Sequence, residues 1–265
     1  MNRLSHMVFA FALFVGLYSL LYAFSVWQSD LGMLYELLQF YLIGGFALSL
    51  VTVPILYYKA PNKNMQARTS SNKSAVSAMF FVTFCVGSLA GTIAYQWYTG
   101  IPIIGNISIF IGALITVTGA LMPDWDIPFL GIQRHRNIIF HSVILPLFIT
   151  LTTLLNVATR LLSASSSLIP INLSAGAEIE YYVTALFLLG YASHLYLDIF
   201  PSDANPLEIL WTAVDSETRA PTGLKPLGPI KISKKYARHY LVSNATLLVF
   251  IAFALFSLYF YSILT

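Results

Sequence analysis

Long apolar stretches alternate with short polar segments along most of the chain. Each stretch holds about 20 residues, enough for a helix to cross the roughly 30 Å hydrocarbon layer of a bilayer. Lipid offers the backbone no outside hydrogen-bond partners, so a helix is the expected structure of each stretch. The pattern predicts helices at 7–28, 36–58, 75–97, 104–122, 138–158, 180–200 and 241–262. We therefore expect an all-α protein that crosses a membrane about seven times, with residues 1–265 forming a single transmembrane domain.

The amino-acid composition indicates the same class of protein. Hydrophobic residues make up 57% of the chain and charged residues only 9%, whereas an ordinary soluble domain carries about 25% charged residues. This composition excludes a soluble globular protein. Cys85 is the only cysteine, so the chain has neither a disulfide framework nor a thiolate zinc cluster. The chain has no acidic or basic tail, so we expect no nucleic-acid partner.

The positions of the basic residues predict the orientation in the membrane. With seven spans and a cytoplasmic N-terminus, 13 of the 14 Lys and Arg residues fall on the cytoplasmic side. Most of them lie in two predicted cytoplasmic loops, 59–74 and 201–240, and only Arg160 falls outside. Membrane proteins concentrate Lys and Arg in their cytoplasmic loops in this way. The first apolar stretch is long and lacks a clear cleavage site, so we interpret it as a membrane helix and not as a signal peptide.

Three short segments hold most of the unusual polar residues, and the predicted topology brings all three to the cytoplasmic side. They are 123–126 at the end of the fourth predicted helix, 135–142 at the start of the fifth and 193–198 in the last turns of the sixth. Ionisable groups near membrane depth are functional candidates by default. Their oxygen and nitrogen donors suit one or two divalent ions such as Zn²⁺, Mn²⁺ or Mg²⁺. The candidate ligands are three histidines and three aspartates: Asp124, Asp126, His135, His141, His194 and Asp198.

The spacing of these residues supports a shared site. His194 and Asp198 stand four residues apart, so on a helix they share one face and a single cation can contact both. His141 lies about one turn inside its predicted helix, where an unpaired imidazole is costly. A proline precedes Asp124 and Asp126 and helps to end the fourth helix, which lets the two carboxylates turn back towards the same place.

Simpler interpretations of the polar residues stay open. Arg134 and Arg136 are either positive-inside anchors or a pair that binds a phosphate headgroup. The candidate ligands can merely flank helix ends or form polar pairs that hold helices together. We interpret His6 as a terminal interfacial residue and His239 as part of the basic run before the last helix.

Three motifs in the polar segments are specific when taken together. They are Gly119-Ala120-Leu121-Met122-Pro123-Asp124-Trp125-Asp126, His135-Arg136 followed by His141-Ser142, and Gly190 through Ser193-His194 to Asp198. With these motifs the chain resembles the YdjM-like (LexA-binding) family of bacterial and archaeal inner-membrane proteins, whose members are described as membrane-bound metal-dependent hydrolases. The resemblance covers residues 119–198 and implies a metal-dependent hydrolase core there, within a multi-pass protein of the inner membrane.

The unit formed by His194 and Asp198 also resembles one used by zinc-dependent phospholipase C and P1-type nucleases. By analogy, this implies hydrolysis of a phosphoester. After Asp198 the sequence departs from the family pattern of a Gly and then a Pro, because residues 200–206 intervene and Trp211-Thr212 stands where the Pro is expected.

The leading hypothesis from the sequence is a hydrolase with its metal site at the cytoplasmic face. Asp124 and Asp126 are the expected catalytic carboxylates, one of them a general base. Arg134 or Arg136 would hold a phosphate of the substrate. A site at the membrane interface favours an amphiphilic substrate, so membrane lipid is the expected partner and a lipid-like or small-molecule phosphoester the expected substrate. Two alternatives stay open: a transporter that binds a cation on its route, and a scaffold whose metal only joins helices.

Overall fold

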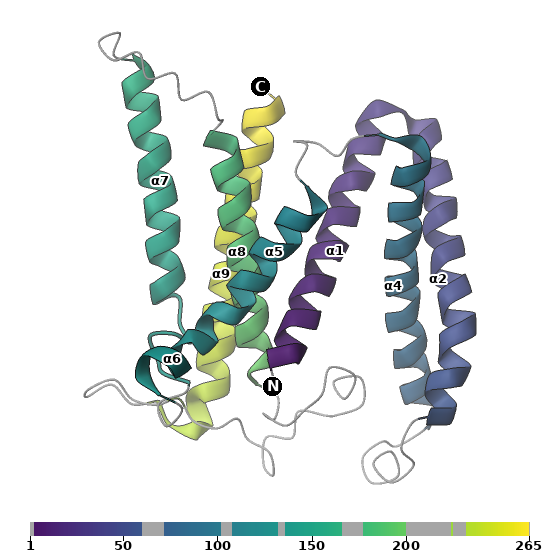
Figure 1. Ribbon diagram of the computed structural model, residues 1–265, viewed down its shortest axis with the longest axis horizontal. Helices are drawn as coiled ribbons and strands as arrows, with labels where there is room; N and C mark the ends of the chain where they lie inside the picture. The colour runs from purple at the N-terminus through teal and green to yellow at the C-terminus, as the bar shows by residue number, and fades with distance from the viewer. Residues whose placement is uncertain are drawn as a thin grey trace. The chain divides into compact units, whose positions relative to one another are not determined.

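The computed structural model describes residues 3–59, 72–101, 108–131, 136–165, 177–199, 224 and 232–264. Within these ranges the regular structure is helical and no β-strand forms (Figure 1), as the apolar pattern predicts. The helices are α1 (Arg3–Ser29), α2 (Leu31–Lys59), α4 (Asn72–Thr99), α5 (Ile109–Leu121), the 3-10 helix η1 (Met122–Trp125), α6 (Asp126–Leu130), α7 (Ile144–Ser165), α8 (Ala177–Leu197) and α9 (Lys234–Leu264).

Four helical segments within the described residues are long and apolar enough to cross a membrane. They are Arg3–Gln28, Leu31–Ile55, Ile109–Leu130 and Tyr236–Tyr261, and Ile144–Thr159 is a shorter apolar helix. Several apolar helices of this length agree with the predicted multi-pass protein. The predicted count of seven spans and the cytoplasmic N-terminus stay predictions.

Residue contacts divide the chain into two compact units, each described by itself. Unit 1 comprises 1–11, 110–203 and 214–265, and unit 2 comprises 12–109 and 204–213. The first turns of α1 therefore belong to unit 1, together with α5 to α9, and the rest of α1 belongs to unit 2. The expected single transmembrane domain stays a prediction, and so do the cytoplasmic loops 59–74 and 201–240, most of whose residues lie outside the described ranges.

In unit 2, α2 and α4 pack closely because glycines face each other. A Cβ atom at Gly87 would overlap the carbonyl oxygen of Gly44, and one at Gly91 would overlap that of Phe40. Small residues of this kind let membrane helices approach each other through their backbones. The Tyr18 hydroxyl of α1 donates to the side-chain oxygen of Gln96 on α4 at 3.0 Å, a polar contact between α1 and α4 in the same unit.

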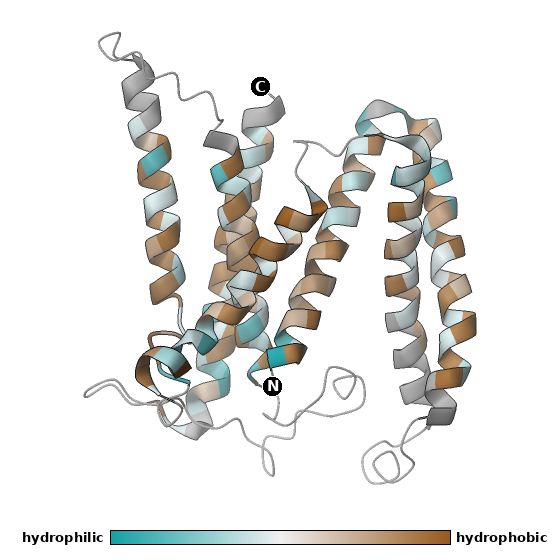
Figure 2. Ribbon diagram, viewed as in Figure 1, coloured by the Kyte–Doolittle hydropathy of each residue, from teal (hydrophilic) through white to brown (hydrophobic). Residues whose placement is uncertain are grey.

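In unit 1, α8 is the central helix, and most of its residues from 182 to 197 are buried. It packs against α7, α9 and η1. A hydrogen bond of 2.7 Å joins the buried Thr153 and Thr184 hydroxyls of α7 and α8. Hydrophobic residues cover most of the helices, whereas the hydrophilic residues of unit 1 gather around the start of α1, the end of α8 and the start of α9 (Figure 2). The polar end of this unit therefore contains the segments that the sequence singles out.

The crossing of α5 and α8 brings two of these segments together. A Cβ atom at Gly190 of α8 would overlap the carbonyl oxygen of Thr116, and one at Gly119 of α5 would overlap that of Phe187. Only glycine permits this approach, because any side chain at either position would push the helices apart. His194 lies one helical turn after Gly190 and therefore near the end of α5.

The end of α5 follows the prediction made from its proline. The helix ends at Leu121, the chain tightens into η1 with Pro123 in its first turn, and α6 follows and ends at Leu130, just before Gly131. Gly131 has a φ of 83°, a conformation that favours glycine. This double turn directs Asp124 and Asp126 back towards α8.

The start of α7 differs from the prediction. The apolar pattern predicted a helix from 138, but α7 begins at Ile144 and residues 138–143 form turns. The Asn137 side chain accepts a hydrogen bond from the backbone N–H of Ile139, and the Ser142 hydroxyl accepts one from that of Ile144. Polar side chains of these types compete with helical hydrogen bonds and favour turns. The turn holds His141 outside the helix in which it was expected.

Candidate metal centre

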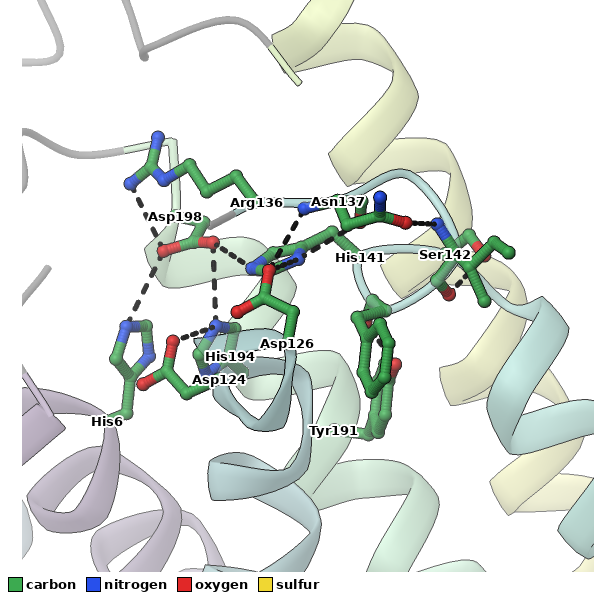
Figure 3. A network of polar contacts seen from close by, with 12 residues as sticks. His6, Asp124, Asp126, Arg136, Asn137, His141, Ser142, Tyr191, His194 and Asp198 are labelled. Atoms are coloured by element: carbon green, nitrogen blue, oxygen red, sulfur yellow. Dashed lines mark hydrogen bonds and ion pairs between the residues drawn. The ribbon is translucent and has the colours of Figure 1, made fainter. Parts of the chain in front are cut away.

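The three polar segments meet in unit 1, as the sequence predicts. Figure 3 shows the side chains of the predicted ligands Asp124, Asp126, His141, His194 and Asp198 converging on one cluster. All five are buried. The other predicted ligand, His135, lies outside the described residues, and so does the predicted phosphate-binding Arg134.

Asp198 occupies the middle of this cluster. Its Oδ2 lies 3.2 Å from Nε2 of His141 and 3.4 Å from Nε2 of His194. Its backbone N–H donates to the carbonyl of His194 at 3.0 Å. The helical pattern thus continues one residue past the end of α8, so the spacing of four puts both side chains on one face.

Backbone and carboxylate oxygens orient the two histidine rings. Nδ1 of His194 lies 2.6 Å from the carbonyl oxygen of Ala120. A carbonyl only accepts hydrogen bonds, so Nδ1 carries a proton, and in the neutral ring Nε2 carries the lone pair. Nδ1 of His141 lies 3.3 Å from the carbonyl oxygen of Asn137 and 3.7 Å from Oδ2 of Asp126. Both rings therefore direct Nε2 towards Asp198, the arrangement typical of histidines that bind metals.

The two aspartates after Pro123 take different positions. Oδ1 of Asp124 lies 3.8 Å from Nε2 of His194, on the side of the ring that faces Asp198. Asp126 is fully buried and accepts the backbone N–H of Asn137 at 3.0 Å. It lies beside Nδ1 of His141 and not beside Nε2. The position of Asp124 therefore suits a metal ligand, whereas the position of Asp126 suits a residue that orients His141.

Arg136 is buried against Asp198. Its Nη2 donates to Oδ1 of Asp198 at 3.3 Å, and only 4% of the residue is exposed. Its φ is 65°, in the left-handed region that residues other than glycine rarely adopt. Strained backbone of this kind persists where the surrounding structure imposes it, and it gathers at functional sites. In this structure Arg136, the predicted phosphate ligand, balances the charge of Asp198.

The sequence interpretation missed His6. It took His6 for a terminal interfacial residue, but the residue is 1% exposed and its ring stacks on that of His194, with centroids 3.7 Å apart and planes 14° apart. Its Nε2 lies 3.5 Å from Oδ1 of Asp198. A signal was present: His6 is an ionisable residue at the start of an apolar helix, and the predicted topology puts it on the same side of the membrane as the other candidates.

The donor set fits one divalent ion. Possible ligand atoms of Asp124, His141 and His194 all lie within 4.8 Å of one another, and so do those of His6, His194 and Asp198. Zinc ligands at 2.0–2.1 Å in a tetrahedron lie about 3.3 Å from each other. The separations of 3.2, 3.4 and 3.8 Å around His194 and Asp198 are close to this value.

A comparison with protein families matches the description "YdjM inner membrane protein" to residues 79–264 of this chain. The chain belongs to this family. The match agrees with the resemblance that the motifs in 119–198 carry, and with the apolar helices it identifies a multi-pass protein of the inner membrane. No curated protein and no solved structure matches the chain.

The YdjM match contains all the site residues that the sequence predicts. It begins within α4 and ends at the last residue of α9, so it includes both glycines at the crossing of α5 and α8. It does not reach α1, and therefore His6 lies outside it.

Proposed function

We propose that this YdjM-family protein is a membrane-bound hydrolase that uses one divalent ion, held by Asp124, His141, His194 and Asp198. The observation that carries this proposal is that Asp198 Oδ2 lies 3.2 and 3.4 Å from the two Nε2 atoms, while ligand atoms of Asp124, His141 and His194 lie within 4.8 Å of one another. A hydrogen bond to the surrounding chain also holds His194, from Nδ1 to the Ala120 carbonyl, as is usual for ligands of metal sites.

The electrostatics of the cluster also favour a cation. Asp124, Asp126 and Asp198 bring three carboxylates into a buried site. In the described part of the chain, the guanidinium groups paired with them are those of the buried Arg136 and of Arg3, whose side chain is 61% exposed and lies 3.8 Å from Asp124. Buried carboxylates are costly unless they pair or coordinate a metal. A divalent ion among these three would add to their stabilisation.

The donor set supports one ion in preference to two. Nδ1 of His194 is hydrogen-bonded to Ala120, so His194 offers only Nε2. Both groups of possible ligands contain His194, and one nitrogen lone pair binds one ion. The second oxygen of Asp198 faces Arg136, whose charge would repel a second cation.

The residues of the cluster then have defined roles in hydrolysis. A bound divalent ion supplies Lewis-acid chemistry, acidifying water and polarising the bond to be cleaved. Asp126 and the Asn137 carbonyl hold the ring of His141, and the Ala120 carbonyl holds that of His194. Asp124 is the least buried of the three carboxylates, with 9% of its side chain exposed, and we assign it the part of general base beside its part as ligand.

An amphiphilic phosphoester is the substrate class that the surroundings favour. Trp125 and Phe129 lie in η1 and α6, directly beside the acidic residues, and are 46% and 68% exposed. Exposed aromatic residues are typical of the membrane interface. We propose further that the long helices make seven spans and that the site faces the cytoplasm, which the distribution of Lys and Arg supports.

Metal content and turnover, measured on one preparation, test the function. The full chain, purified in detergent and stripped with a chelator, would be loaded with Zn²⁺, Mn²⁺ or Mg²⁺ and assayed on micelles of phosphate-bearing lipids. We expect about one ion per chain and hydrolysis of a phosphoester. H194A and D198A should lose both, whereas H239A, a change at an exposed histidine of α9, should keep both.

Two results would contradict the hydrolase. Bound metal without hydrolysis of any lipid tested would indicate the scaffold, and cation flux into liposomes that H194A abolishes would indicate the transporter. If H194A keeps both metal and turnover, the proposed site is wrong.

A further inference from the structure

The first turn of α1 is built into the metal centre. Ser5 and His6 are 0% and 1% exposed, although they lie only a few residues from the start of the helix. Arg3 contributes a contact of 3.8 Å to Asp124. Figure 3 shows the His6 ring directed at the carboxylate of Asp198, on the side away from His141. This segment lies outside residues 79–264, over which the family matches.

The two oxygens of Asp198 face different groups. Oδ2 faces Nε2 of His141 and of His194, the direction of the proposed ion. Oδ1 faces Nε2 of His6 at 3.5 Å and Nη2 of Arg136 at 3.3 Å. Carboxylates that bind a metal are themselves held by hydrogen bonds, which fix their orientation. His6 and Arg136 thus both contact Oδ1, the oxygen of Asp198 that does not face the proposed ion.

His6 also restricts the ring of His194. That ring is bonded to Ala120 through Nδ1, and its face is covered by His6. It also meets the His141 ring, with centroids 5.5 Å apart and planes at 63°. With these three contacts the ring cannot rotate away without losing packing. His6 thus contacts two of the four proposed ligands.

The same geometry argues against His6 as a ligand of this ion. An imidazole lone pair lies in the plane of its ring. The planes of His6 and His194 are only 14° apart and stack with centroids 3.7 Å from each other. An ion in the plane of the His194 ring therefore lies well outside the plane of the His6 ring. Nδ1 of His6 has no hydrogen-bond partner among the described residues, whereas the ring stacks on His194 and its Nε2 faces Asp198.

We propose that His6 is a positioning residue of the metal centre, so that the N-terminal helix forms part of the site although it lies outside the family match. The inference rests on the metal-binding part of the proposed function. His6 acts through His194 and Asp198, and its loss should weaken the binding of the ion without changing the ligands.

Cobalt binding tests this role. Co²⁺ would be titrated into the stripped full chain in detergent and followed by its visible absorption, whose bands report the donor atoms. We expect H6A to lower the affinity for Co²⁺ roughly 10- to 100-fold, as is usual for residues that hold metal ligands, with the bands at saturation unchanged. H6F, which keeps a stacking ring but not the nitrogen that faces Asp198, should bind Co²⁺ more tightly than H6A and less tightly than the wild type. H239A should match the wild type.

Three outcomes would overturn the inference on His6. An affinity of H6A equal to that of the wild type would remove His6 from the site, and changed bands at saturation would make it a ligand. The circular dichroism of H6F serves as the control for folding. A wild-type chain that binds no Co²⁺ would refute the metal centre and His6 together. A chain that binds Co²⁺ but hydrolyses no lipid would refute the hydrolase alone and leave the result on His6 standing.

Discussion

At the scale of single residues, the two nitrogens of each histidine separate ligands from the residues that orient them. Nε2 of His141 and of His194 face the carboxylate of Asp198, whereas both Nδ1 atoms face acceptors of the surrounding chain. Asp126 is one of these acceptors. From the sequence alone, Asp126 was grouped with the predicted ligands because it stands two residues after Asp124. Only the contacts of Asp126 distinguish the two carboxylates.

Asparagine at position 126 tests this distinction. Asp126→Asn keeps an oxygen that can accept the N–H of Asn137 but removes the charge beside His141. We expect metal affinity to fall roughly 10- to 100-fold with the ion still binding at saturation. Metal content measured by mass spectrometry across a range of concentrations is the readout. The variant D198N, which changes a proposed ligand, is the comparison, and an equally complete loss of metal in both variants would make Asp126 a ligand.

At the scale of helices, glycine contacts position the site. Gly119 and Gly190 let the backbones of α5 and α8 touch. The crossing lies one turn before His194 and shortly before Asp124, so the ligands on the two helices depend on it. Inside a membrane, close packing and not the hydrophobic effect holds helices together, so this contact is expected to matter for the fold.

Alanine at position 190 should therefore weaken both the fold and the site. A Cβ atom there overlaps the carbonyl oxygen of Thr116, and overpacking of this kind costs about 1–3 kcal/mol. Gly190→Ala should lower the melting temperature in detergent and reduce the affinity for metal. Gly16→Ala is the matched control, because nothing lies within 4 Å of its added Cβ and alanine favours a helix by about 0.5–1 kcal/mol over glycine. Equal melting temperatures for the two variants would show that the crossing tolerates a side chain.

At the scale of the whole molecule, the charge distribution predicts how the chain lies in the membrane. Thirteen of the 14 Lys and Arg residues share one side if the chain spans seven times. Losing or adding one span would scatter these charges over both sides of the membrane. Orientation of this kind depends on the loops and not on contacts between helices.

Cysteine labelling tests the topology directly, because the chain has a single cysteine that serine can replace. In a Cys85→Ser background, Ser71→Cys and Ser202→Cys should react with a membrane-impermeant maleimide only in inverted vesicles. Ser166→Cys should react only from the periplasmic side in whole cells. Labelling of Ser71→Cys and Ser166→Cys from the same side would rule out the seven-span arrangement.

Much of the fold was predictable from the sequence because it depends on local properties. A run of apolar residues specifies a helix wherever it occurs in lipid, and α1, α2, α4, α5, α7, α8 and α9 each overlap a predicted stretch, although α9 begins at Lys234 and not at 241. Pro123 ends its helix by its own geometry. The predicted start of α7 was wrong. The side chains of Asn137 and Ser142 accept hydrogen bonds from nearby backbone N–H groups, and these bonds compete with those of a helix.

The features of the site likewise divide into those that the sequence predicts and those that only the tertiary structure decides. The sequence by itself determined which segments carry ionisable groups at one end of the apolar helices, and the spacing of four determined that His194 and Asp198 share a face. Only the tertiary structure decided that His6 from α1 covers His194, that Asp126 holds His141 and that Arg136 pairs with Asp198. Those contacts join residues far apart in the chain, and no local pattern records which face of one helix meets another. The close crossing at Gly119 and Gly190 fixes one such meeting, that of α5 with α8, because the two glycines let these backbones touch.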